Sequence, residues 1–238
     1  IIKASDSNLF SRMQYELAKV VYLLDKREDA NLQTLYSIEV LLYRLLEHHG
    51  NINDTKFIKE IMSNPESLME IIDKTYLSSD ENERSAEIEQ VKNDNSYALL
   101  GWHIFYTLRQ TPFVDSNNTI DEVALNNYID QLQTLGNAKH KIKGVNTVIG
   151  ELLGNYPETE DYPPVPICDI IERLNNKEVN DGFRTRLYNK RGITVRPAYD
   201  GGTLEKNEAN KYKKYADKIR YTHPIVCSIF DDLSGDYN

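Results

Sequence analysis

Apolar residues recur every three or four positions along most of this chain, and that spacing restricts the chain to helices packed along one side. Because an α-helix turns once every 3.6 residues, positions spaced in this way share one face. The spacing predicts a helix over residues 9–24 and a second over residues 31–48, paired antiparallel across the charged turn at residues 25–29. The stripe of the first helix consists of Phe10, Met13, Leu17, Val20, Val21 and Leu24.

Start and stop signals divide the following residues into further short helices. Pro65 suits the first turn of a helix, and Thr119 with Glu122 has the spacing of a capping box. Residues 97–108 are apolar almost all round, which is typical of a helix buried on several sides. We therefore expect residues 97–108 to form the central helix, with shorter helices over residues 145–153, 167–174 and 203–220 and another starting at Pro224.

A single β element is expected in this helical chain. Polar and apolar residues alternate loosely from Arg184 to Tyr188, residues 189–192 are turn formers, and residues 193–196 are β-prone. A helix ended by Gly192 is the alternative. The predicted fold class is mostly α: an irregular helical bundle or a solenoid-like array, with one small β-hairpin near residues 184–196.

A polar, acidic stretch suggests how the chain is organised into domains. Residues 78–95 offer few side chains that can anchor them to a core. We expect an N-terminal helical subdomain over residues 1–78, an acidic linker or helix start over residues 79–95, and a C-terminal helical subdomain over residues 96–238.

Composition narrows the setting in which the protein works. The only two cysteines, Cys168 and Cys227, lie far apart and form no CxxC pair, so we interpret them as reduced core residues of a cytoplasmic protein. No apolar run approaches the roughly 20 residues that a bilayer span requires, so no membrane contact is expected. Because the sequence starts at Ile1 without a signal-peptide profile, we expect it to be part of a longer protein.

Motifs for catalysis or metal binding are missing. Gly201 and Gly202 lack the lysine and hydroxyl residue that end a phosphate-binding loop, and none of the five histidines lies in an HExxH pattern. No serine-nucleophile motif occurs. We therefore predict no catalytic residues, no metal and no cofactor, and we favour a non-enzymatic role without excluding an enzymatic one.

A concentration of positive charge near the carboxyl end is the strongest indication of a partner. Residues 183–220, here called the basic segment, carry a net charge of +7 in a chain with a net charge of -9. Such a surface attracts ligands of opposite charge and orients their approach. The candidate binding residues are Arg184, Arg186, Lys190, Arg191, Arg196, Lys211, Lys214 and Lys218.

Two kinds of partner fit this charge. Guanidinium groups clamp phosphates, and Tyr188 and Tyr199 are available for stacking on unpaired bases, which favours nucleic acid. The acidic balance of the whole chain opposes a polyanion, which favours a protein partner or another domain of the same protein. Lys211, Lys214 and Lys218 also have an internal alternative, docking on the acidic residues 66–94.

Several short phrases, taken in order, resemble the C-terminal helical region of large uncharacterised bacterial multidomain proteins. The resemblance implies a bacterial multidomain protein and no particular activity. We therefore interpret the chain as a non-catalytic helical protein-interaction or sensing module, with nucleic-acid binding through the basic segment as the alternative. The phrases are Asn64-Pro65 with Leu68-Met69-Glu70, Leu100-Gly101-Trp102, Val148-Ile149-Gly150, Tyr188-Asn189 with Arg191-Gly192-Ile193, Gly201-Gly202 with Glu205, and Tyr237.

Overall fold

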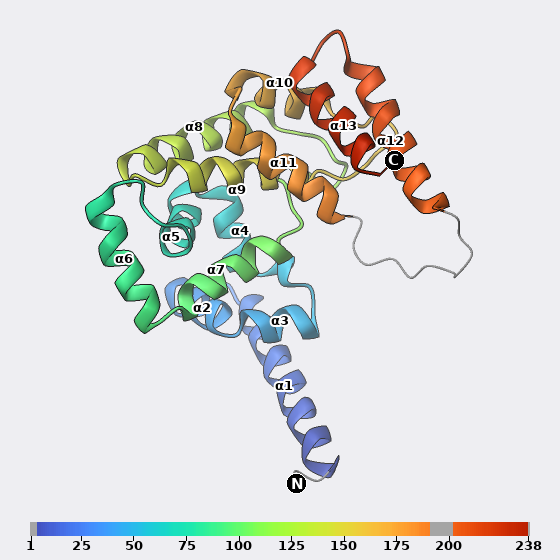
Figure 1. Cartoon of the computed structure of the whole chain (residues 1–238). Helices are drawn as coiled ribbons and strands as arrows, with labels where there is room; N and C mark the ends of the chain where they lie inside the picture. Colours follow the sequence, from blue (N-terminus) through green and yellow to red (C-terminus); the bar gives the residue numbers. More distant parts are fainter. Residues whose placement is uncertain (1–3, 191–201, 238) are drawn as a thin grey trace.

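The structure is a computed structural model that describes residues 4–190 and 202–237. Within these ranges the chain is mostly helical: it forms thirteen α-helices and one short 3-10 helix, and its only β pairing is an isolated bridge between Val114 and Ile120 (Figure 1). In chain order the elements are α1 (Ala4–Asp25), α2 (Leu32–Leu41), α3 (Tyr43–His49), η1 (Ile52–Asp54), α4 (Lys56–Ser63), α5 (Pro65–Thr75), α6 (Glu81–Asn93), α7 (Ser96–Thr107), α8 (Glu122–Ala138), α9 (Ile142–Gly154), α10 (Val165–Leu174), α11 (Lys177–Lys190), α12 (Thr203–Ile219) and α13 (Pro224–Asp236).

The β-hairpin expected near residues 184–196 is not supported. Residues 184–190 are the last turns of α11, and the remaining residues 191–196 lie outside the described ranges. Val179, Phe183 and Leu187 follow one another at four-residue intervals and are all buried. Residues with this helical spacing share one face of α11, and that face packs on the core. Their burial therefore favours a helix over the strand that the loose polar and apolar alternation predicted.

The boundaries of three helices differ from those the sequence predicts. The helix expected over residues 31–48 is divided into α2 and α3 at Leu42. The cap of α8 is Asp121, whose carboxylate accepts a hydrogen bond from the Ala124 amide at 3.0 Å, instead of Thr119.

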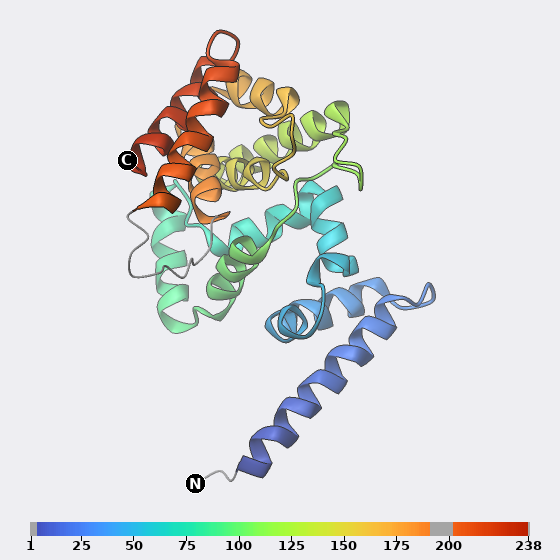
Figure 2. The same cartoon turned by 90° about the vertical axis from the view of Figure 1, so that its right-hand side faces the viewer.

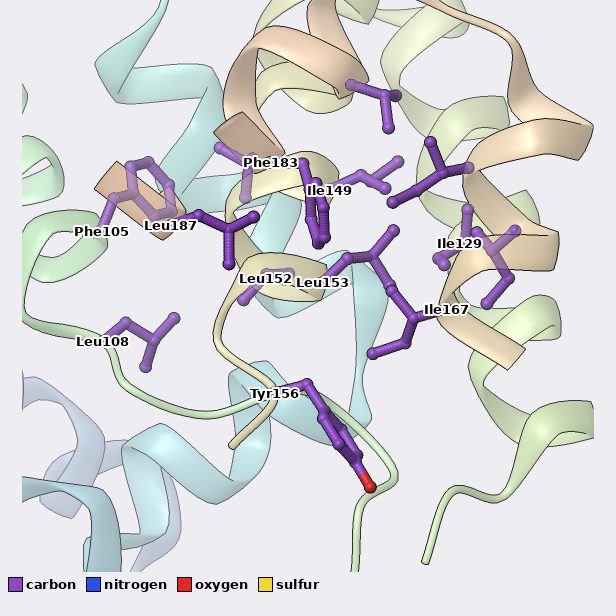
Figure 3. Close-up of a cluster of buried hydrophobic side chains, with 14 of the residues drawn as sticks. Phe105, Leu108, Ile129, Ile149, Leu152, Leu153, Tyr156, Ile167, Phe183 and Leu187 are labelled. Atoms are coloured by element: carbon purple, nitrogen blue, oxygen red, sulfur yellow. The ribbon is translucent and has the colours of Figure 1, made fainter. Parts of the chain in front are cut away.

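The core is organised around α9, which packs against α8 and α11. Most of its residues are buried, including Val145, Ile149 and Leu153. Figure 3 shows Ile149, Leu152 and Leu153 of this helix surrounded by Phe105, Ile129, Ile167, Phe183 and Leu187 from other segments. The expectation that residues 97–108 form the central helix is therefore wrong, because α9 occupies that place.

Two glycines allow α9 and α11 to pack with their backbones in close approach. A Cβ atom on Gly150 would lie 2.1 Å from the carbonyl oxygen of Val179, and a Cβ on Gly182 would lie 2.2 Å from that of Thr147. No real side chain tolerates these distances. The Val148-Ile149-Gly150 phrase thus marks a tight helix crossing.

α12 and α13 form an antiparallel pair that covers α10 and α11. Their contact is aromatic: the ring of Tyr212 stacks on Phe230 and on Tyr237, with centroid distances of 6.1 and 6.0 Å. Cys168 of α10 and Cys227 of α13 are buried and unpaired, as their separation in sequence predicts.

Helices on the two sides of the acidic stretch contact each other directly. The Tyr128 hydroxyl of α8 donates to the carbonyl of Ile61 in α4 at 2.5 Å, and the nearly inaccessible Lys141 ammonium donates to the carbonyl of Tyr76 at 2.6 Å and the Glu87 carboxylate at 2.5 Å. The acidic stretch itself forms α6, none of whose residues is buried. The division into residues 1–78, 79–95 and 96–238 stays a prediction about independent folding.

α1 leaves the body of the molecule as a long projecting helix (Figure 2). Its described contacts begin in its middle, where the ring of Tyr15 lies 6.1 Å from that of His49. They continue toward its carboxyl end, where Ala18 and Val21 are buried and the Tyr22 hydroxyl donates to the carbonyl of Leu46 at 2.9 Å. No helix in residues 4–190 or 202–237 combines the length and apolar character needed to cross a membrane.

Candidate functional site

Of the candidate binding residues, Arg186 of α11 lies deepest. Its side chain is 3 % exposed; Nε donates to the Asn155 side chain and Nη1 to the carbonyl of Tyr106 at 3.1 Å. Burial, together with the charge of Arg109, lowers its pKa to about 10, while Glu151 acts in the opposite direction. Arg186 therefore joins α11 to the ends of α7 and α9 instead of facing a ligand.

Lys190 follows one turn later and is also turned inward. Its ammonium donates to the carbonyl of Tyr156, and burial lowers its pKa to about 8. Arg186, Lys211 and Arg109 lower it further through charge repulsion. Three of the predicted residues are thus gathered around the segment after α9, and Arg109, which the sequence analysis did not single out, is the fourth cation there.

The predicted lysines of α12 contact the loop between α9 and α10. Lys211 pairs with Glu158 at 3.3 Å and with Glu208 at 2.6 Å, and the Lys218 ammonium donates to the carbonyl of Asp161 at 2.8 Å. They do not dock on residues 66–94. Lys214 is exposed, and within the described ranges it has no partner.

The other charges of the basic segment are mostly neutralised by acids of α13. Arg184 pairs with Asp236 at 2.5 Å, and Arg220 pairs with Asp231 at 2.9 Å, an acid that Lys213 also reaches at 3.0 Å. Arg191 and Arg196 lie outside the described residues. In the described part of the chain, these cations connect α11, α12 and α13 to one another and to the loop between α9 and α10. Few positive charges therefore remain unpaired and able to bind a partner.

A different surface stands out, and it is apolar. α7 presents three large apolar side chains to solvent on its outer side, where Leu99 is 51 % exposed, Trp102 48 % and Tyr106 63 %. Tyr97, at the start of α7, is 59 % exposed on the opposite side of the helix. An all-round apolar helix is normally covered by protein, so one that remains exposed indicates a missing partner. The apolar character of residues 97–108 was visible in the sequence, but it was interpreted as burial.

α1 carries a second exposed apolar stripe. Met13, Leu17 and Val20 are 62, 43 and 51 % exposed, and their spacing of four and three places them on one side of the helix. Ala18 and Val21, which hold α1 to the body, lie on another side. These residues belong to the apolar stripe from which the helix was predicted. Of that stripe, Val21 packs against the body of the molecule, whereas Met13, Leu17 and Val20 remain exposed.

One cleft, here called the α1–α7 cleft, is lined by Leu99 of the exposed α7 side and, from α1, by Gln14 next to the stripe. It has a volume of about 940 Å³ and lies between α1, α3, the end of α2 and the first half of α7. Leu41, which is 77 % exposed, Leu45 and Leu99 give it apolar walls, and Arg44 and His48 add polar ones.

A smaller groove lies on the other side of α7. It has a volume of about 360 Å³, with walls from α2, α5 and α7 and a floor from Phe57 and Ile61 of α4. Polar side chains such as Gln33, Glu70 and Lys74 share its lining with apolar ones. The Glu60 carboxylate accepts hydrogen bonds from Asn64 at 2.8 Å and from Ser67 at 2.9 Å. Both hollows therefore adjoin the same exposed helix.

The histidines take part in structural pairs. His103 contacts Glu47 with 2.8 Å between Nε2 and the carboxylate, on the rim of the α1–α7 cleft. His223 contacts Asp169 and Thr222, which gives a hydroxyl, imidazole and carboxylate in line. The Thr222 hydroxyl, however, also donates to the carbonyl of Ile219, in the turn that starts α13. Among the residues that the structure describes, no group of three or more His, Cys, Asp or Glu side chains is arranged to hold a metal ion.

Comparison with known proteins gives no relative: no family model, no curated protein and no solved structure matches this chain.

Proposed function

We propose that this chain is a non-catalytic helical module that binds another protein through the exposed apolar surface of α7, α1 and the cleft between them. The observation that carries the proposal is the exposure of Tyr97, Leu99, Trp102 and Tyr106 on a single helix. Aromatic side chains that are already held in place lose little entropy when a partner covers them, and they dominate binding energies at interfaces.

The proposal moves the contact surface away from the basic segment. Arg186 is buried, the half-buried Lys190 donates to the carbonyl of Tyr156, and Arg184, Lys211 and Lys218 already have internal partners. The nucleic-acid alternative has less support for the same reason, since phosphate binding draws its energy from cations that are free to meet phosphates. We retain the cytoplasm of a bacterium as the setting and a larger parent protein as the context, in line with the unpaired cysteines and the sequence resemblance.

Matched tyrosine substitutions test the proposal. Tyr106 is 63 % exposed on α7, and Tyr221 is 95 % exposed at the turn between α12 and α13, so Tyr106→Asp and Tyr221→Asp make the same change on different surfaces. Proteins captured from extracts of the source cells are purified, and their affinity for each variant is measured by titration calorimetry. We expect Tyr106→Asp to weaken binding roughly tenfold or more and Tyr221→Asp to leave it within about twofold.

Charge reversal of Lys214 completes the test. Lys214 is exposed on the basic segment and has no partner in the described part of the chain, so Lys214→Glu changes that surface without breaking a visible contact. A partner that tolerates Tyr106→Asp and is lost with Lys214→Glu would refute the proposed surface and restore the basic segment as the binding site.

A further inference from the structure

The α1–α7 cleft has the dimensions of a site for a helix. A helix with its side chains is a cylinder roughly 10 Å wide with a pitch of 5.4 Å, so about 940 Å³ corresponds to roughly two turns. Leucine side chains from three helices, among them Leu41, Leu45 and Leu99, share the walls with polar side chains, an arrangement suited to an amphipathic helix that brings both an apolar face and polar edges.

The molecule itself displays a helix of matching length and character. The exposed stripe from Met13 to Val20 on α1 covers eight residues, again about two turns. Among the α1 residues from Ser11 onward, whose side chains the structure describes, only Gln14 lines the cleft of its own copy, so Met13, Leu17 and Val20 remain uncovered beside the cleft that they fit. The stripe and the cleft are thus adjacent, complementary and both unoccupied by the chain that carries them.

We propose that the α1–α7 cleft receives α1 from a second copy of this chain, so that two copies exchange their projecting α1 helices around a two-fold axis. This inference rests on the proposed function and names the first partner of that surface. A two-fold arrangement places each stripe in the cleft of the other copy, because an isologous contact uses the same two surfaces twice.

The exposed area agrees with a dimer of moderate stability. Side chains of this size each remove roughly 60–120 Å² of apolar surface from water when fully buried. Met13, Leu17, Val20, Leu41 and Leu99 are 43–77 % exposed, and Trp102, on α7 outside the cleft lining, is 48 % exposed, so together they offer roughly 300 Å² per copy. Since apolar atoms make up about 57 % of an interface, the total buried by two copies is roughly 1,000–1,200 Å², at the lower end for specific contacts.

Complementing variants provide the test. The oligomeric state of the whole chain is measured by light scattering on a sizing column at roughly 10–100 µM, and the exchange predicts twice the chain mass of 27.5 kDa. Leu17→Asp damages the α1 stripe, Leu99→Asp damages the cleft, and each alone should give a monomer. Mixed in equal amounts, they should regain a dimer with one intact α1-in-cleft contact, at an affinity reduced roughly tenfold or more.

Ser11→Asp is the matched control, because it adds the same charge to an exposed position of α1 away from the stripe and should remain dimeric. Circular dichroism melts verify that both leucine variants stay folded, as their exposure predicts. A wild-type chain that is monomeric at these concentrations, or a mixture that does not reassociate, overturns the exchange. If a monomeric wild-type chain still binds a purified partner that Tyr106→Asp rejects, the proposed function stands while this inference fails; if it binds none, both fail.

Discussion

Replacing Glu39 by glutamine should stabilise this protein at neutral and alkaline pH. Glu39 of α2 is 0 % exposed, and its Oε2 accepts a hydrogen bond from the Phe57 amide at 2.8 Å. Next to it, the Asp25 carboxylate accepts from the Lys56 amide at 2.8 Å. Two carboxyl groups thus cap the first two amides of α4, and they tie α1 and α2 to that helix end.

Two negative charges on this pair of carboxyl groups are unfavourable in free energy, because Glu39 is removed from water. Burial is the main cause that raises the pKa of Glu39, from an ordinary 4.5 to about 7, and the hydrogen bond to Asp25 raises it further while the Phe57 amide opposes the shift. The helix end favours an anion, but removing the carboxylate from water costs more. Glu39 therefore releases its proton near pH 7 instead of near pH 4.5.

The sign of the pH dependence follows from the direction of the shift. Between pH 4.5 and about 7 the folded state binds the proton that the unfolded state has released, so this group makes the free energy of unfolding fall as pH rises through that window. A pKa unit corresponds to about 1.4 kcal/mol, which gives an upper limit of roughly 3 kcal/mol for the full shift. The Glu39→Gln side chain can still accept the hydrogen bond from the Phe57 amide and cannot ionise, so it avoids this loss.

Urea unfolding followed by circular dichroism at a series of pH values measures the effect. We expect Glu39→Gln to match the wild type near pH 5 and to exceed it by about 2–3 kcal/mol near pH 8. Glu89→Gln, an exposed change on α6, serves as the control and should follow the wild-type curve throughout. A Glu39→Gln curve that runs parallel to that of the wild type from acid to alkaline pH would refute the raised pKa of Glu39.

Two further stability predictions follow from the packing of the carboxyl half. Gly182→Ala places a methyl group 2.2 Å from a backbone oxygen of α9 and should cost roughly 2–4 kcal/mol in urea unfolding, whereas Gly235→Ala, with open space around it, should be neutral or add up to about 1 kcal/mol. Lys218→Glu removes the donor to the carbonyl of Asp161 and places an acid there, so it should lower the melting temperature by several degrees. Lys214→Glu, the control at an exposed position of the same helix, should leave the melting temperature nearly unchanged. Equal effects of the two substitutions would contradict the internal role of Lys218.

Local patterns in the sequence predicted most of the helices, because each depends on residues within a few turns. Asn64 and Pro65 start α5 as expected, with the Asn64 side chain accepting from the Glu66 amide at 3.0 Å. The predicted β-hairpin is not supported because residues 179–187 carry two patterns at once. Val179, Phe183 and Leu187 have helical spacing and are buried, whereas the alternation that predicted a strand involves exposed residues. Packing against α9 favours the helix, and that packing is not visible in the local sequence.

The position of the positive charges in sequence did not reveal their role. Lys211 and Glu158 lie far apart along the chain, as do Arg184 and Asp236, so their pairing depends on how α11, α12 and α13 pack. A net charge of +7 over the basic segment describes its composition and not the field outside the folded protein. Acids from α13 and from the loop after α9 cancel much of it.

α7 is an exception to the rule that an apolar helix is buried, and the exception bears on function. Its sequence fits a helix covered on all sides, but the fold covers only Gly101, Ile104 and Phe105, since α9 already fills the centre of the core. Leaving Leu99, Trp102 and Tyr106 in water gains nothing for an isolated chain and promotes aggregation. Sequences that break a local rule without a compensating gain in stability do so most often at functional sites. The same argument applies to the α1 stripe, so the two surfaces bordering one cleft are best explained by a single interface that covers both.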